Sequence, residues 1–361
     1  MTSGPEEFDG PDVSYTPPMP KTYEPSIGFI GCGYISDSHL AAYAGAGFDV
    51  VALCNRTISK AEEKRERYYP NADVYSDYAD VLERPDVDVV VATPHPKQRE
   101  PILKDAIRAG KHVLSQKPLA VDLDFAEELV AMADAHDVKL AVHQPMRWDP
   151  HFNYVRQAVR SGILGTAMST HLTYHFDHEE EILDTKFEEV GHILLYDLGI
   201  HYFDYVVTVM DRRPETVWAS LDRAPNQTAV PPLLGQAHVE FDTGQSSVVT
   251  DGCTKRGQER RIYVAGTEGS ARTIQYDDGS RSLRLSSSRW SGEPTIEEDP
   301  HANDLGTLTE LLCAIEEDRE PSHSAANNLA SLELCFAAVA SAETGEPKTP
   351  GEVREMYGAV K

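Results

Sequence analysis

Runs of consecutive apolar residues alternate with amphipathic segments through the first half of the chain. A strand buried on both faces of a parallel sheet has this character, and such runs lie at residues 26–30, 49–54, 87–94, 111–115 and 139–142. Between them, apolar residues show helical spacing at residues 102–107 and 125–133. The alternation predicts an α/β, doubly wound parallel sheet over residues 26–146, with ligands bound at the carboxyl ends of its strands.

Beyond residue 147 the strands alternate apolar and polar residues instead. These segments lie at residues 168–176, 217–221, 236–241, 246–250 and 260–264. Alternation means that one face is buried, so residues 147–361 are predicted to form an α+β domain with an antiparallel, open sheet. Helices are expected at residues 152–160, 191–205, 305–315 and 329–340. The open sheet is a natural face for assembly into a homodimer or homotetramer.

Residues 1–25 carry six prolines and few aliphatic side chains. This composition is typical of an extended arm rather than of a domain. It leaves open whether the arm is a disordered tail or wraps a neighbouring subunit.

Charge and composition exclude several partners. The 59 acidic residues against 33 basic ones give a net charge of −26, which disfavours binding to a phosphate backbone and hence to nucleic acid. The excess of carboxylates also suggests a surface kept soluble at high salt. No apolar run is long enough for a membrane span, and the first ten residues lack a signal sequence. Five cysteines without a Cys-x-x-Cys pair suit a reducing compartment, so we expect a cytoplasmic protein.

A glycine turn follows the first apolar run. In the stretch 26–36, Gly31 would make the tight turn and Gly33 would let backbone N–H groups approach a pyrophosphate at a helix N-terminus. The third small position of this fingerprint is Ser36. The Gly-x-Gly motif on its own is weak evidence for dinucleotide binding. Because strands and helices alternate around it, we predict a dinucleotide site here.

The end of the second apolar run predicts the choice of dinucleotide. An NAD site has a carboxylate there to bind the ribose 2′-hydroxyl, whereas this chain has Asn55 and Arg56. Asn55 does not repel a 2′-phosphate, and the Arg56 guanidinium can bind one. The local chemistry therefore favours NADP, with NAD as the alternative and a solvated loop charge as the competing interpretation of Arg56.

Two candidate catalytic groups stand out. Asp197 and His201 are four residues apart on a predicted helix, where a carboxylate can hold an imidazole ready to take a proton from an alcohol. Lys117 follows a predicted strand, where a ligand is expected, and could hold a substrate hydroxyl. The alternatives are an ordinary helix pair and a surface lysine.

Other residues are weighed as ligands of a metal or of substrate. His171, His175 and His178 precede three glutamates, but one local stretch without a second cluster does not make a metal shell, so no metal is expected. His175 is instead a candidate substrate contact. Arg147 and Trp148 either line the substrate site or pack at a domain interface.

Three stretches together resemble the signatures of the glucose-fructose oxidoreductase / inositol dehydrogenase / rhizopine catabolism (Gfo/Idh/MocA) family. They are Ile30-Gly-Cys-Gly-Tyr-Ile-Ser36, Ala109-Gly-Lys-His-Val-Leu-Ser-Gln-Lys-Pro118 and Asp197-Leu-Gly-Ile-His-Tyr-Phe-Asp204. The resemblance covers roughly residues 26–350 and implies a Rossmann domain, a second domain with a large, mostly antiparallel sheet, bound NAD(P), and oxidation of a sugar, sugar-acid or cyclitol hydroxyl.

The same resemblance implies roles for individual residues. Lys117 matches the lysine of the family's Glu-Lys-Pro motif, and Asp197 and His201 match its acid and histidine, so His201 would be the acid/base with Lys117 and Asp197 positioning the hydroxyl. The implied substrate contacts are Lys117, Arg147, Trp148, His175, Asp197 and His201, and the implied cofactor contacts are Gly31, Gly33, Tyr34, Ile35, Asn55, Arg56, Thr93, Pro94, Gln116 and Lys117. Gln116 departs from the motif's glutamate. A non-catalytic NAD(P)-sensing regulator is the alternative function.

Overall fold

The computed structural model describes residues 6–8 and 10–356. Its internal contacts divide the chain into two units. The parallel-sheet unit comprises residues 16–148 and 299–329, and the large-sheet unit comprises the described parts of residues 1–15, 149–298 and 330–361.

Among its described residues, the parallel-sheet unit contains six strands in the order β4-β3-β2-β5-β6-β7, all paired in parallel. The strands are β2 (Ser26–Ile30), β3 (Asp49–Cys54), β4 (Asp73–Tyr75), β5 (Val89–Ala92), β6 (His112–Ser115) and β7 (Leu140–Val142). The helical segments are α1 (Ser36–Gly45), α2 (Ile58–Tyr68), α3 (Tyr78–Leu82), α4 (Pro96–Arg108), α5 (Leu123–Ala135), η1 (Pro145–Trp148) and α9 (Ala302–Glu316). The strand order reverses between β2 and β5, and a doubly wound sheet binds its ligands at that point.

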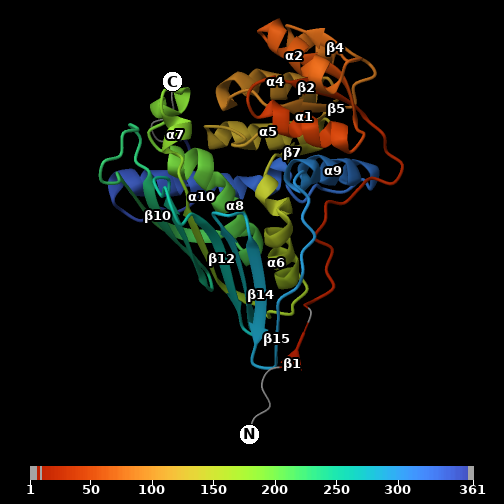
Figure 1. The fold of residues 1–361 in the computed structure, drawn as a ribbon. Coiled ribbons are helices and arrows are strands. Elements are labelled where there is room, and N and C mark those ends of the chain that lie inside the picture. The colour runs from red at the N-terminus through yellow and green to blue at the C-terminus, as the bar shows by residue number, and fades with distance from the viewer. Residues whose placement is uncertain (1–5, 9, 357–361) are drawn as a thin grey trace. The chain divides into compact units, whose positions relative to one another are not determined.

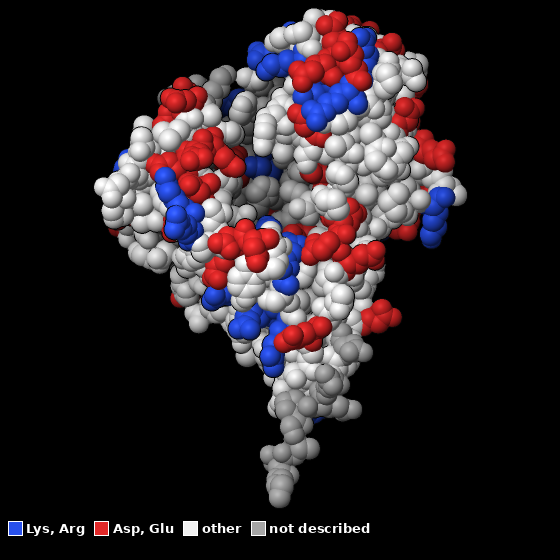
Figure 2. Space-filling model, in the orientation of Figure 1, with Lys and Arg blue, Asp and Glu red and all other residues white. Residues whose placement is uncertain are grey.

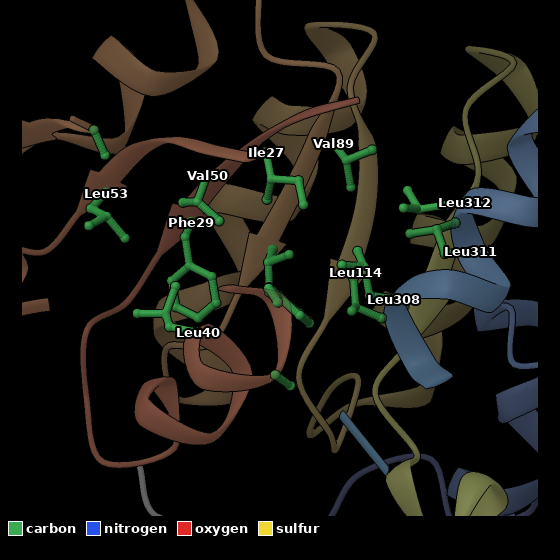
Figure 3. Packing of buried hydrophobic residues seen from close by; sticks show 14 of the residues in the cluster. Ile27, Phe29, Leu40, Val50, Leu53, Val89, Leu114, Leu308, Leu311 and Leu312 are labelled. Carbon is green, nitrogen blue, oxygen red and sulfur yellow. The ribbon is translucent and has the colours of Figure 1, made fainter. Parts of the chain in front are cut away.

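The core of this unit explains why α9 belongs to it. Leu308, Leu311 and Leu312 of α9 are fully buried in the same cluster as Ile27 and Phe29 of β2 (Figure 3). The sequence pattern assigns residues 299–329 to the second domain, because the chain enters them after the alternating strands. Burial of the α9 leucines against the parallel sheet instead places this segment in the parallel-sheet unit.

Among its described residues, the large-sheet unit contains nine strands in the order β1-β15-β14-β13-β12-β8-β11-β10-β9. The pairs β8–β11 and β1–β15 are parallel and the others antiparallel. The strands are β1 (Glu6–Glu7), β8 (Ala167–His175), β9 (Pro214–Asp222), β10 (Leu234–Phe241), β11 (Gln245–Asp251), β12 (Glu259–Gly266), β13 (Gly269–Tyr276), β14 (Arg281–Ser287) and β15 (Trp290–Gly292). The predicted fold class is confirmed in both halves of the chain.

Helices cover one face of this sheet, as Figure 1 shows for α6 and α8. The helical segments are α6 (Pro150–Arg160), α7 (Glu179–Ile182), η2 (Lys186–Glu189), η3 (Leu194–Leu198), α8 (Gly199–Met210) and α10 (Ala325–Thr344). The helix predicted over residues 191–205 is present from residue 193, and its first part is the π-helical turn η3, which passes into α8.

The arm packs on its own chain where it is described. The Tyr15 carbonyl accepts a hydrogen bond from the Asn153 amide at 2.7 Å, and the Tyr15 ring lies edge-on to Tyr154. Further along, the backbone N–H groups of Lys21, Thr22 and Tyr23 donate to the Glu316 carboxylate. Residues 10–25 are thus held by intrachain contacts, while residues 1–5 and 9 lie outside the described residues.

Figure 2 shows the acidic side chains of this face in several separate groups, with lysines and arginines beside many of them. Many of these charges are paired, as in the contact of Lys64 with Asp37 at 2.8 Å. Of the helices in the part of the chain that the structure describes, none combines the length and the apolar character needed to cross a membrane.

Candidate active site

The turn after β2 can be formed only with glycine at its first position. Gly31 has a φ of +104°, and a Cβ there would lie 2.5 Å from Thr93 Oγ1 and 2.9 Å from Pro94 Cδ. The Gly31 N–H donates to the Cys54 carbonyl at 2.8 Å, and the Thr93 hydroxyl donates to the Gly31 carbonyl at 2.6 Å. The ends of β2, β3 and β5 therefore meet closely around this residue.

The space beside the second glycine is open. A Cβ at Gly33 would meet no atom of the described residues within 4 Å, and Tyr34 is 96% exposed. Ser36, at the third position of the fingerprint, is fully buried and its hydroxyl donates to the Gly33 carbonyl at 2.5 Å. Serine therefore fits the close packing of strand and helix, and the turn leaves room for a phosphate group before α1.

The side chain of Asn55, directly after β3, stabilises this turn by hydrogen bonds. Its Oδ1 accepts from the Cys32 N–H at 3.1 Å, and its amide donates to the Thr57 carbonyl at 2.9 Å. Arg56, the next residue, is exposed. Of the two residues expected to select the dinucleotide, Asn55 has its side chain engaged in the turn and Arg56 presents its charge to solvent.

Arg99 is a buried residue that the sequence did not single out. It is fully buried, and its guanidinium donates to the carbonyls of Pro94 and Pro118, which follow β5 and β6. The charge is stabilised by these carbonyls, so one side chain ties together two loops at the carboxyl edge of the sheet. The available signal in the sequence was an arginine shortly after Thr93-Pro94, where the third of the parallel strands ends.

Lys117 follows β6 at the same edge. It is half-buried and is preceded by Gln116, which is 8% exposed. Gln116 Oε1 accepts from the backbone N–H of Lys117 at 2.7 Å. The main chain at Lys117 is therefore fixed by the side chain of its neighbour.

Asp197 and His201 belong to the large-sheet unit and are both half-buried. Asp197 lies in the π-helical turn η3 and His201 in the first turn of α8. Gly199 stands at the junction, where a Cβ would lie 3.1 Å from the Leu194 carbonyl oxygen. Such π-turns occur frequently at functional sites, and this one was not predicted from the helical spacing.

Two further histidines accompany this pair in the large-sheet unit. His175 Nδ1 lies 3.8 Å from the Asp251 carboxylate, and His178 Nδ1 lies 2.8 Å from Glu181. Burial lowers the pKa of His178, opposed by the nearby carboxylates of Glu181 and Asp197. The Asp197 carboxylate thus acts electrostatically on His178, a relation that sequence spacing did not indicate.

Arg147 and Trp148 are both buried in the parallel-sheet unit. The Arg147 guanidinium donates to the Ser322 carbonyl, and the Trp148 ring lies edge-on to His323 at 4.9 Å. The Trp148 ring also packs against Gly306 of α9, where a Cβ would come within 2.2 Å of its Cγ atom.

His39, His143 and Asp304 form a buried cluster in the parallel-sheet unit. Their potential ligand atoms lie within 4.8 Å of one another. The His143 Nε2 and Asp304 Oδ1 atoms are 2.9 Å apart, and the rings of His39 and His143 lie tilted to one another at 43° with centroids 4.2 Å apart. We interpret the cluster as a hydrogen-bonded network, because the ring nitrogens of His39 also contact Tyr43 and Gln116.

The comparisons with known proteins address both units. Residues 26–144 match the oxidoreductase family with an NAD-binding Rossmann fold, and residues 152–272 match the GFO/IDH/MocA C-terminal domain. The chain belongs to the Gfo/Idh/MocA family. This membership confirms the resemblance that the three sequence stretches carry.

Individual relatives match this Gfo/Idh/MocA chain over different shares of its length. The D-apiose dehydrogenase of Paraburkholderia graminis is 27% identical over 361 residues, covering 92% of this chain and 93% of the relative. The inositol 2-dehydrogenase of Ralstonia nicotianae is 32% identical over 151 residues, 41% of this chain and 45% of the relative.

A solved structure supports the fold of the Gfo/Idh/MocA chain. The oxidoreductase from Agrobacterium radiobacter, solved in complex with NAD⁺, L-tartaric acid and magnesium, superposes with a TM-score of 0.80 at 21% identity. The match covers 91% of this chain and 99% of that one. The open space beside Gly33 and the close contact of Gly31 with Thr93 and Pro94 fit the dinucleotide that the family binds.

Proposed function

We propose that the protein is an NAD(P)-dependent oxidoreductase that acts on a hydroxyl-bearing carbon of a sugar, sugar acid or cyclitol. The observation that carries the proposal is that this Gfo/Idh/MocA chain retains Lys117, Asp197 and His201 together. The names of the D-apiose and inositol dehydrogenase relatives support the substrate class.

Each of the three side chains has a role in this reaction. The nicotinamide of the bound cofactor supplies the hydride acceptor or donor. His201 takes the hydroxyl proton during oxidation and returns it during reduction, which suits an imidazole near neutral pH. Lys117 and Asp197 orient and polarise the hydroxyl, and Asp197 lies in the π-turn η3, a feature frequent at functional sites.

The test is turnover with a panel of sugars and cyclitols, using NADP and NAD. Lys117→Ala and His201→Ala are expected to lower kcat by at least about 100-fold with the fold retained, since acid/base groups contribute roughly that factor. Lys348→Ala, on a lysine outside the proposed site, is the matched control. Near-normal rates in both site variants would refute the assignment, and cofactor binding without turnover on any substrate would favour the regulatory alternative.

We further propose a preference for NADP. The support is local: Arg56 is exposed after β3, and no carboxylate stands at this position to bind a ribose 2′-hydroxyl. Arg56→Ala is expected to raise the KM for NADP about tenfold while leaving that for NAD unchanged, because a guanidinium–phosphate contact is lost. Equal effects on both cofactors would contradict the preference.

We also propose a cytoplasmic homodimer or homotetramer that assembles through the large sheet. Four large apolar side chains on its strands are more than a third exposed: Met168, Trp218, Tyr263 and Tyr276. The Tyr263 ring is stacked with His171 of the neighbouring strand, which gives a flat aromatic patch suited to self-association. Light scattering of Trp218→Glu tests this, and an unchanged mass relative to the parent protein would refute it.

A further inference from the structure

A series of buried, hydrogen-bonded polar groups extends from α1 to the backbone N–H of Lys117. His39 is fully buried, and its Nδ1 lies 2.9 Å from the Tyr43 hydroxyl. On the other side of the ring, His39 Nε2 lies 3.3 Å from the Gln116 side-chain nitrogen. Gln116 Oε1 in turn accepts from the Lys117 N–H at 2.7 Å.

These contacts determine which atom carries the proton in each hydrogen bond of this series. A backbone N–H only donates, so Gln116 must present its oxygen to Lys117 and its NH₂ group to His39. That group also only donates, so His39 Nε2 must carry a lone pair. The ring proton is therefore on Nδ1, where it is donated to the Tyr43 hydroxyl, and the imidazole is neutral.

The other groups around His39 agree with a neutral ring. The ring lies tilted against His143, which pairs with Asp304, and it makes an edge-to-face contact with Phe29. The Ser38 hydroxyl also donates to Asp304. The Asp304 charge is thus engaged by His143 and Ser38, and burial lowers the pKa of His39 to about 3.

We propose that Gln116 is a positioning residue, which holds the main chain at Lys117 in place for hydride transfer and sets the tautomer of His39. The proposal rests on the proposed function of Lys117. A glutamate at this position, as in the motif that the chain resembles, would still accept from the Lys117 N–H. Its second oxygen would face the lone pair of His39 Nε2, and that repulsion ends only when Nε2 takes a proton.

The tautomer is tested without measuring activity. Solid-state NMR of protein labelled with ¹⁵N-histidine reports the protonation of each ring nitrogen, and the His39 signals are assigned by their loss in His39→Asn. We expect Nδ1–H and a bare Nε2 in the parent protein, and a protonated Nε2 in Gln116→Glu. Gln245→Glu, on an exposed strand residue, adds the same charge elsewhere and should leave His39 unchanged.

The positioning role is tested by kinetics. Gln116→Met removes both hydrogen bonds at similar volume, and we expect kcat to fall by roughly 10- to 100-fold with the KM for substrate changed less than about threefold, because misplacement of a reacting group costs rate. Gln116→Glu should add a pH dependence to kcat that the parent and Gln245→Glu lack. Thermal melting of each variant verifies that it is folded.

The outcomes separate the two proposals. A protonated Nε2 on His39 in the parent protein would overturn the deduced chain of hydrogen bonds. Normal kcat in Gln116→Met, with Lys117→Ala inactive, would overturn the positioning role and leave the proposed function standing. Normal turnover in Lys117→Ala would overturn the proposed function and the positioning role together, while the NMR result still reports the tautomer.

Discussion

At the scale of single residues, side chains that donate hydrogen bonds to backbone carbonyls hold together the loops at the carboxyl edge of the parallel sheet. Thr93 binds the carbonyl of Gly31, and Arg99 binds those of Pro94 and Pro118. These bonds order the loops that precede and follow the candidate cofactor contacts. The rigidity of the site is thus supplied by residues that are not themselves candidates for chemistry.

Arg99→Met is expected to destabilise the protein. The substitution removes charge-assisted hydrogen bonds and leaves two carbonyls without that donor, so the free energy of unfolding should fall by about 2–4 kcal/mol, measured by urea denaturation. Arg108→Met, on an exposed arginine of the same helix, should change it by less than about 0.5 kcal/mol. Equal losses in the two variants would show that the buried bonds contribute nothing specific.

At the scale of elements, the arm is attached to α9 by one carboxylate. Glu316 accepts from the backbone N–H groups of Lys21, Thr22 and Tyr23 and from the Thr22 hydroxyl. These bonds, that of Lys21 foremost, lower the pKa of Glu316 from 4.5 to about 2. The arm is consequently coupled to the ionisation of the last residue of α9.

This coupling predicts an acid-induced release of the arm. Because the pKa of Glu316 is lower in the folded state, its contribution is fully present above about pH 4.5 and is lost as the pH falls through about 2. Hydrogen exchange should show protection of the amides of Lys21, Thr22 and Tyr23 disappearing in that window.

Glu316→Gln should remove the protection of the Lys21 amide already at neutral pH, because the new NH₂ group cannot accept from it, while the remaining oxygen can still accept from Thr22 and Tyr23. Glu317→Gln serves as the neighbouring control, since Glu317 pairs with Arg319 instead. Protection of the Lys21 amide that persists in Glu316→Gln would contradict the attachment.

At the scale of the whole molecule, the dominant feature is a net charge of −26. Like charges spread over the surface repel one another and oppose folding unless ions screen them. The screening length falls from about 10 Å at 0.1 M salt to about 3 Å at 1 M. Stability is therefore expected to depend on ionic strength.

The melting midpoint should rise by about 5 °C or more between roughly 0.1 and 2 M KCl, measured by scanning calorimetry. Replacing the exposed Glu62 and Glu66 of α2 by glutamine should reduce that rise, because it removes two of the repelling charges. A flat melting curve over this range of salt would exclude salt adaptation of the surface.

Local pattern determined much of this protein. Apolar runs predicted β3 to the residue and the strands around it closely, because a strand buried on both faces leaves a continuous signal. The motifs predicted the glycine turn and the family, since a turn such as that at Gly31 depends on adjacent residues. The sequence also offered Lys117, Asp197 and His201 as candidates, which stay predictions.

Only the tertiary structure decided what distant residues do. The place of α9 in the parallel-sheet unit depends on which sheet buries Leu308 and Leu311. The apolar pattern of a helix predicts that one face is buried, but not against which sheet it packs. The π-turn before α8 and the carbonyls that Arg99 binds arise likewise from packing between segments. The tautomer of His39 follows from a side chain 77 positions away, because hydrogen bonds in a core are fixed by neighbours in space rather than in sequence.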